Sequence, residues 1–192
     1  METLATNQVY PTAITVAGGA VFFTTATAVK SVPVTGGPIT THGDQLAGPN
    51  GLAVGAGTIF FPLYNGGSIG RSTGGVVSTV VSGQSFPSGI VLAAGRLYYT
   101  CTGDGTVRTV LPDGSGASVV TDGWGYPLAI VSDGASLYFT TAVGDVVRVR
   151  TDGTGLTLLA TGEQGPEGIA IDGTTVYWVT HPGDEVRALS PR

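Results

Sequence analysis

The sequence predicts an all-β fold built from five copies of one structural unit. Three observations support this prediction: a turn-rich composition, a repeated pattern of landmarks, and the lack of helical periodicity in any segment. Of the 192 residues, 32 are glycine and 11 are proline, while 42% are hydrophobic and 11% are charged. Such a chain has enough apolar residues for a packed core and too few charges for a coiled coil. The composition therefore indicates short strands joined by tight turns.

Two landmarks recur through the chain with a nearly constant period. A Pro-x-[Gly/Ala]-[Ile/Leu] motif begins at Pro11, Pro49, Pro87, Pro127 and Pro166, with spacings of 38, 38, 40 and 39 residues. An aromatic pair follows eleven residues after each proline: Phe22-Phe23, Phe60-Phe61, Tyr98-Tyr99, Tyr138-Phe139 and Tyr177-Trp178. One basic residue follows each pair, at Lys30, Arg71, Arg108, Arg148 and Arg187. Self-similarity at this period is the signature of a repeat architecture.

Each repeat is expected to contain four short strands. An apolar run such as Gly168–Ile171 suits a buried first strand, and Asp172-Gly173 supplies hairpin-turn residues that tolerate positive φ. The aromatic strand comes next, then the strand with the basic residue, then a second turn and a last strand such as Leu156–Leu159. Four antiparallel strands in about 39 residues form one blade of a β-propeller. The sequence thus predicts a five-bladed propeller, residues 1–192 being one domain with blade units 11–48, 49–86, 87–126, 127–165 and 166–192 plus 1–10.

The ends of the sequence predict how the ring closes. The last unit runs from Pro166 to Arg192, which leaves room for three strands, while Glu2–Thr6 resembles the last strand of the fourth unit. We therefore expect this N-terminal strand to pair with the C-terminal blade, close the ring and cover an exposed sheet edge.

The landmarks themselves are expected to be structural. Adjacent residues of a strand point to opposite faces, so one ring of each aromatic pair should pack between neighbouring blades and the other on the opposite face. The recurrence of the basic residue favours a repeated structural contact, in which its stem covers apolar surface. Arg108, Arg148 and Arg187 are therefore expected to behave alike.

The repeat units resemble those of the YWTD and NHL classes of β-propeller. The resemblance rests on Leu97–Thr100, Val107-Arg108 and Pro112–Gly114, and on the corresponding residues of the later units. It covers the whole chain, and it implies binding of proteins, glycans or small molecules. The chain departs from those classes in having five units. It also lacks the acidic residue that ends the YWTD signature, because Thr25, Leu63, Cys101, Thr141 and Thr180 stand there.

A ligand site is expected where the loops between blades converge. The residue after each repeat proline should ring this face and differs from unit to unit: Thr12, Asn50, Ser88, Leu128 and Glu167. Aromatic residues outside the pairs fall on the same face: Tyr10, Tyr64, Phe86, Trp124 and Tyr126. Since Trp124 lies between two glycines, we expect it to be exposed. Exposed rings near carboxylates suit a sugar or a cationic small molecule.

Two enzymatic alternatives follow from resemblance to other propellers. Gluconolactonase- and paraoxonase-type propellers hold a divalent cation in the channel, and Asn50 and Glu167 have the right type of oxygen for Ca²⁺. A virginiamycin-lyase-type activity would recruit His181 as general base together with Glu167. No Ser/His/Asp spacing, phosphate loop or Cys/His pair supports other chemistry.

Charge and cysteine content limit the partners and the compartment. Residues 1–100 carry two acids and three bases, and residues 101–192 carry eleven acids and five bases, so the net charges of +1 and −6 sum to −5. An acidic half and no basic stripe exclude nucleic acid as the expected partner. No apolar run of membrane-spanning length and no signal peptide is found, and the single Cys101 forms no internal disulfide.

These observations favour a monomeric, soluble, non-enzymatic binding module with a small polar ligand, glycan or protein on the loop face. No cofactor is expected for this function. The alternatives are the metal-dependent hydrolase or lyase, for which Ca²⁺ would be the cofactor, and a plain scaffold without a ligand of its own.

Overall fold

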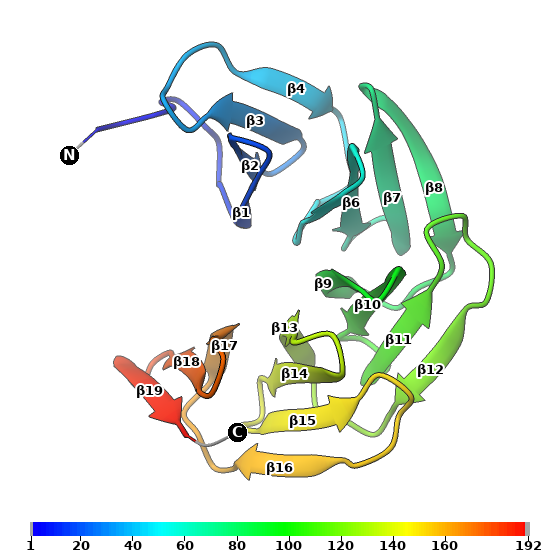
Figure 1. Cartoon of the computed structure of the whole chain (residues 1–192), viewed down its shortest axis with the longest axis vertical. Helices are drawn as coiled ribbons and strands as arrows, with labels where there is room; N and C mark the ends of the chain where they lie inside the picture. The colour runs from blue at the N-terminus through cyan, green and yellow to red at the C-terminus, as the bar shows by residue number, and fades with distance from the viewer. Residues whose placement is uncertain (1, 191–192) are drawn as a thin grey trace. The chain divides into compact units, whose positions relative to one another are not determined.

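The computed structural model describes residues 2–190, which form nineteen β-strands and no helix (Figure 1). The strands make five antiparallel sheets, four of four strands and one of three. The chain divides into two compact units, of which the first ends at Pro87 and the second begins at Ser88. In the described part of the chain no helix is long and apolar enough to span a membrane.

The first unit holds the first two sheets. The first sheet contains β1 (Ile14–Ala17), β2 (Ala20–Thr24), β3 (Val29–Pro33) and β4 (Thr40–Gly43), which neighbour one another in chain order. The second contains β5 (Ala53–Gly55), β6 (Thr58–Leu63), β7 (Ser68–Thr73) and β8 (Val76–Ser82) in the same order.

The second unit holds the other three sheets. The third sheet contains β9 (Pro87–Ala93), β10 (Arg96–Cys101), β11 (Thr106–Val110) and β12 (Ser118–Thr121). The fourth contains β13 (Pro127–Ser132), β14 (Ser136–Thr141), β15 (Val146–Arg150) and β16 (Thr157–Ala160). The fifth contains β17 (Pro166–Ile171), β18 (Val176–Thr180) and β19 (Glu185–Leu189). Each predicted repeat thus forms one sheet, and the predicted fold class, a five-bladed β-propeller, is confirmed.

Tight turns of the predicted kind join the first two strands of the first three sheets. Gly18-Gly19, Ala56-Gly57 and Ala94-Gly95 all have positive φ at both residues. This is the geometry of a two-residue hairpin whose twist matches the flanking strands. The glycine-rich composition therefore reflects the backbone conformation at these turns.

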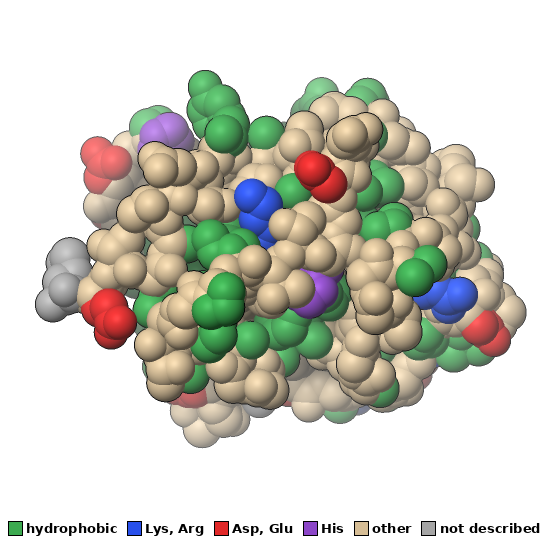
Figure 2. All heavy atoms as spheres, turned by 90° about the horizontal axis from the view of Figure 1, so that it is seen from above, with side chains coloured by type: hydrophobic (Ala, Val, Ile, Leu, Met, Phe, Trp, Pro, Cys, Tyr) green, Lys and Arg blue, Asp and Glu red, His purple; other side chains and the backbone are tan. Residues whose placement is uncertain are grey.

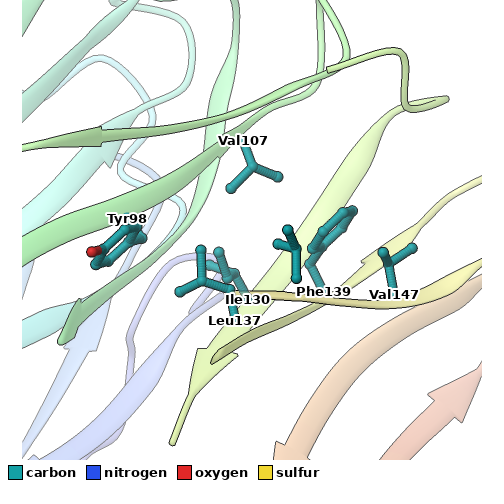
Figure 3. Close-up of a cluster of buried hydrophobic side chains, with 7 residues drawn as sticks. Tyr98, Val107, Ile130, Leu137, Phe139 and Val147 are labelled. Atoms are coloured by element: carbon teal, nitrogen blue, oxygen red, sulfur yellow. The ribbon is translucent and has the colours of Figure 1, made fainter. Parts of the chain in front are cut away.

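The core lies between consecutive sheets, as predicted for the aromatic pairs. In the second unit, Tyr98 of β10 belongs to one buried cluster with Ile130 of β13 and Leu137 and Phe139 of β14 (Figure 3). A second buried cluster joins Tyr138 of the fourth sheet to residues of the fifth. The first rings of the pairs in the first, third and fourth sheets, Phe22, Tyr98 and Tyr138, therefore face the following sheet.

The predicted N-terminal strand is the part of the fold that the structure corrects. Residues 2–10 form no strand, so the fifth sheet has three strands among the described residues. Leu4 and Ala5 instead line an apolar groove on the first sheet, and Gln8 Oε1 accepts a hydrogen bond from Lys30 Nζ at 3.0 Å. The apolar residues of this segment thus gain burial on the first sheet without strand pairing.

Candidate functional site

Two positions recur in every blade at the loops around the repeat proline, the surface that we call the loop face. The first is the predicted position directly after the proline. The second, three residues after the aromatic pair, is occupied by Ala26, Tyr64, Thr102, Ala142 and His181. One hydrogen bond shows that the loops share a geometry: Tyr64, Ala142 and His181 donate their backbone N–H to the carbonyl of the residue before a repeat proline.

In the first unit these positions form a pocket of about 270 Å³. Its lining includes the predicted residues Thr12 and Asn50, together with the aromatic residues Tyr10 and Tyr64. The remaining lining residues are Thr25, Ala26, Gly48, Pro49 and Asn65. The structure therefore brings together two predicted site residues and two of the aromatic residues that lie outside the repeated pairs.

The pocket combines ring faces with neutral hydrogen-bonding groups. Tyr64 is half-buried and packs against Phe86 with ring centroids 5.2 Å apart, so its position is fixed. Thr12 Oγ1 lies 2.8 Å from Thr24 Oγ1, which holds that hydroxyl at the pocket wall. None of the described residues that line the pocket is charged. These features suit an uncharged ligand that has both apolar and hydroxyl surface.

The residue before each repeat proline has an unusual backbone conformation. Tyr10, Gly48, Phe86, Tyr126 and Gly165 all have φ between 48° and 69°. Glycine adopts this region freely, whereas other residues pay roughly 1–2 kcal/mol. Three aromatic residues nevertheless occupy it, and their side chains are exposed, Tyr10 by 79%. Phe86 packs against Tyr64, and strain at such exposed aromatic residues is typical of functional loops.

In the second unit, Glu167 and His181 occupy the two recurrent positions of the fifth blade. His181 Nδ1 lies 3.8 Å from Glu167 Oε1, and both side chains are exposed. The separation exceeds that of a direct hydrogen bond. The fifth blade thus carries an acid and an imidazole at the positions where the second blade carries Asn50 and Tyr64.

Three other predicted site residues have different surroundings. The expectation that Trp124 is exposed is wrong, because its ring packs edge-on against Phe139 at 5.2 Å and its Nε1 donates to Thr121 Oγ1 at 3.1 Å. Trp124 is partly buried and packs against the core cluster between the third and fourth sheets, where a large side chain fills space. Ser88 is buried, whereas Tyr126 is exposed as expected.

Metal ligands are not gathered in the described structure. Among residues 2–190 no group of three or more His, Cys, Asp or Glu side chains is close enough to hold a metal ion. Asn50 belongs to the first compact unit and Glu167 to the second.

The sequence analysis did not predict Asn65 as a site residue, and it did not identify the second recurrent position as a repeated site position. Asn65 follows Tyr64, and both lie in the turn after the aromatic strand β6. A signal was present in the sequence, since the position three residues after each aromatic pair varies in chemistry as strongly as the position after each proline.

Comparison with known proteins identifies the fold and no family. No protein-family model and no curated protein sequence matches the chain. A chain of the nidogen/laminin complex superposes with a TM-score of 0.85 at 20% identity, over 94% of this chain and 76% of that one. A streptogramin B lyase superposes at 0.73 with 23% identity, over 97% and 70%. A protein of unknown function from Bacteroides thetaiotaomicron superposes at 0.74 with 14% identity, over 92% and 54%.

These similarities confirm the repeat β-propeller fold that the repeat motifs predict. At such low identities they show the fold alone, because one propeller scaffold carries many unrelated functions.

Proposed function

We propose that the protein is a non-enzymatic binding module that takes a small uncharged polar ligand, of the carbohydrate class, in the pocket of the first unit. The observation that carries this proposal is the convergence of Tyr10, Tyr64, Asn50, Asn65 and Thr12 on one pocket of about 270 Å³. A volume of this size suits one or two sugar rings rather than a macromolecule.

The chemistry of the lining supports a sugar over an ion. A pyranose presents an apolar C–H face, which stacks on the ring of a tyrosine, and a rim of hydroxyls, which side-chain amides and threonine hydroxyls can bind. A charged ligand would enter this pocket without an opposite charge and would lose its hydration. Tyr10 is expected to form the movable wall, because its side chain is exposed, and Tyr64 the fixed wall.

A glycan array followed by calorimetric titration of the selected sugar tests the proposal. Tyr10→Gly removes one wall and keeps the backbone conformation, so it should weaken binding by roughly 10-fold or more, as expected for the loss of about 1.5 kcal/mol of aromatic contact. Tyr126→Gly is the matched control, because Tyr126 has the same φ class and exposure but does not line the pocket. Equal losses in both variants, or no sugar bound, would contradict the proposal.

A lyase activity is the second candidate, and the pair formed by Glu167 and His181 is the observation that favours it. The imidazole would act as general base, with the carboxylate orienting it, on a substrate of the type that the structurally similar streptogramin B lyase acts on. Incubation with a streptogramin B and analysis of the products by mass spectrometry tests this reading. Turnover that His181→Ala abolishes and Tyr10→Gly preserves would place the function in the second unit.

A further inference from the structure

The asparagines of this chain are few, and two of them lie in the same pocket. The sequence contains only Asn7, Asn50 and Asn65, and the last two are each followed by glycine. Both Asn50 and Asn65 line the pocket of the first unit. The pocket therefore contains two copies of the Asn-Gly sequence, in which glycine leaves its own backbone nitrogen unshielded and its backbone free to rotate.

An Asn-Gly sequence can react with itself and with water. The backbone nitrogen of the glycine loses its proton and attacks the side-chain Cγ of the asparagine. The Cγ–Nδ2 bond breaks, ammonia leaves, and a five-membered succinimide ring remains. Water then adds to one of the two ring carbonyl carbons and opens the ring, which gives aspartate or isoaspartate. Either product carries a negative charge where the asparagine was neutral, so the modification changes the electrostatics of its surroundings.

The turn that joins β6 and β7 meets the requirements of this reaction at Asn65. Asn65 and Gly66 are both exposed to water. The side-chain amide of Asn65 forms no hydrogen bond with any residue between 2 and 190, and the backbone N–H of Gly66 forms none either. The leaving group and the attacking nitrogen are therefore not held by other parts of the described chain.

The neighbours of Asn65 place the reaction inside the pocket. Asn65 N–H donates to Ala47 O at 3.1 Å and Tyr64 N–H donates to Gly48 O at 2.9 Å, which holds the turn against the preceding loop. A β-carbon added to Gly48 would lie 2.7 Å from Asn65 Nδ2, so the carboxamide lies directly over Gly48, which also lines the pocket. All four residues belong to the first unit.

Asn50 and Asn7 have less favourable surroundings for the same reaction. The backbone N–H of Asn50 donates to Pro62 O at 3.2 Å, and Gly51, which would supply the attacking nitrogen, is buried just before strand β5. Moving Gly51 toward the Asn50 side chain would disturb packed structure. Asn7 is exposed, but the side chain of the following Gln8 shields the attacking nitrogen. Asn65 should therefore react faster than either.

We propose that Asn65 is a site of spontaneous deamidation, which gives the pocket of the first unit a negative charge as the protein ages. None of the described residues that line the pocket is charged, so the new carboxylate has no counter-ion there. Isoaspartate also adds one carbon to the main chain between Leu63 and Ser68, which pair across this turn. The modification thus changes both the charge of the pocket and the path of the turn that carries Tyr64.

The consequence for a ligand rests on the proposed function of this pocket. An uncharged sugar would lose the amide donor of Asn65 and would displace water from a carboxylate without replacing its charge balance. Ageing should therefore weaken binding of the selected sugar by roughly 10-fold, which corresponds to about 1.4 kcal/mol. Calorimetric titration of fresh and aged protein measures this change.

Peptide mapping by mass spectrometry of protein aged at neutral and at mildly alkaline pH tests the modification without any ligand. Aspartate and isoaspartate should accumulate at Asn65 at least about 10-fold faster than at Asn50. The rate should rise with pH, because the attacking nitrogen must lose its proton. Gly66→Ala should slow the conversion, since its methyl group shields that nitrogen. Its Cβ would lie 3.2 Å from those of Ala47 and Leu63, so a circular dichroism spectrum checks its fold.

Asn65→Gln is the matched control, because it keeps the amide and disfavours the five-membered ring. On ion-exchange chromatography the aged wild type should acquire a more acidic form that this variant lacks. An Asn65 that stays intact, conversion of Asn50 or Asn7 at an equal rate, or ageing of Gly66→Ala as fast as the wild type would each overturn the proposal. Conversion of Asn65 in a protein that binds no sugar would support the modification and contradict the proposed function.

Discussion

Tyr10, Phe86 and Tyr126 occupy a backbone region where the same repeat position elsewhere uses Gly48 and Gly165. The glycines show that the backbone requires a positive φ at this position. The aromatic residues adopt the same φ and place a ring on the loop face. The exposed rings of Tyr10 and Tyr126 contribute little packing that could offset this steric cost, whereas Phe86 packs against Tyr64.

Tyr126→Gly is therefore expected to leave the free energy of unfolding unchanged or to raise it by up to about 1 kcal/mol. The relief of the positive φ outweighs or balances the larger backbone entropy of glycine in the unfolded chain. Urea denaturation of the two proteins measures the difference. A loss of more than about 1 kcal/mol would mean that the ring packs in a way that its exposure does not indicate.

His42 gives stability a dependence on pH. Its Nε2 lies 2.8 Å from Ser31 Oγ, and its ring packs against Phe22 at 5.5 Å. Burial lowers the pKa of His42 because the charged imidazolium is poorly solvated there. The unfolded chain thus binds a proton more readily than the folded one at this site, and protonation favours unfolding as the pH falls below about 6.5.

We expect the free energy of unfolding to decrease between pH 7 and pH 5 in the wild type. His42→Gln keeps a polar side chain opposite Ser31 and should flatten this part of the pH profile. Urea denaturation of both proteins at several pH values measures the effect. The same slope in both would assign the dependence to other groups.

At the scale of single elements, β10 and β14, the second strands of the third and fourth sheets, carry the contact to the next sheet. Thr140 of β14 is fully buried, donates to Glu167 O at 2.9 Å and accepts from Ala129 N at 3.3 Å. Thr100 of β10 makes the equivalent pair of bonds. The fifth sheet has Val179 at this position.

Thr140→Val is expected to cost about 1–2 kcal/mol, because it leaves the Glu167 carbonyl without its donor at a buried interface. Val179→Thr is the matched control and should change stability by less than about 0.5 kcal/mol, since that side chain is exposed. Chemical denaturation compares the two. Equal effects would show that the hydroxyl bond between the sheets does not contribute.

The basic residues of the third strands have different partners in different blades, so the expectation that they behave alike is not supported. Arg187 pairs with Glu163 at 3.0 Å and Glu185 at 2.6 Å, and hydrogen bonding to Glu185 raises the pKa of Arg187. Arg108 pairs with Asp104 at 2.9 Å. Arg148 makes a long hydrogen bond of 3.4 Å to Thr157 Oγ1. Each of the three arginines therefore has a different set of partners.

Arg187→Met is therefore expected to lower the Tm more than Arg148→Met. The Glu163 side chain is 7% exposed and would keep only the Trp178 Nε1 donor if its cation were removed. Thermal denaturation tests this, and adding Glu163→Gln to Arg187→Met should recover part of the loss, because a neutral amide needs no cation. Equal Tm losses in the two single variants would restore the prediction of equivalence.

For the whole molecule, the repeat predicts an uneven distribution of local stability. Strands β10 and β14 lie between two hydrogen-bonded neighbours and are buried along most of their length. Strand β19 is a sheet edge with an exposed surface, and residues 2–10 form no strand. Amides that open easily are those with few buried contacts.

Hydrogen exchange followed by mass spectrometry should accordingly find the slowest amides in β10 and β14 and the fastest in residues 2–10 and in β19. Slow exchange in residues 2–10 would indicate a paired N-terminal strand. Figure 2 shows charged side chains scattered over one face, with no large patch of a single charge. Ionic strength should therefore have little effect on this pattern.

The sequence by itself determined the blades. The proline motif, the aromatic pair and the glycine turns of each unit act within about 39 residues, so the period alone indicates four strands, their order and the rings that are buried. It also determined where variation concentrates, and Thr12 and Asn50 do share a pocket with Tyr10 and Tyr64.

Only the tertiary structure decided which residues a side chain packs against when its partner lies in another repeat or another strand. Trp124 was expected in solvent because of its glycine neighbours, yet it packs on Phe139 of the following sheet. Residues 2–6 match a strand by composition, yet Leu4 and Ala5 line a groove of the first sheet. Local pattern specifies backbone conformation, whereas the partner of a side chain is set by burial against residues that are distant in sequence.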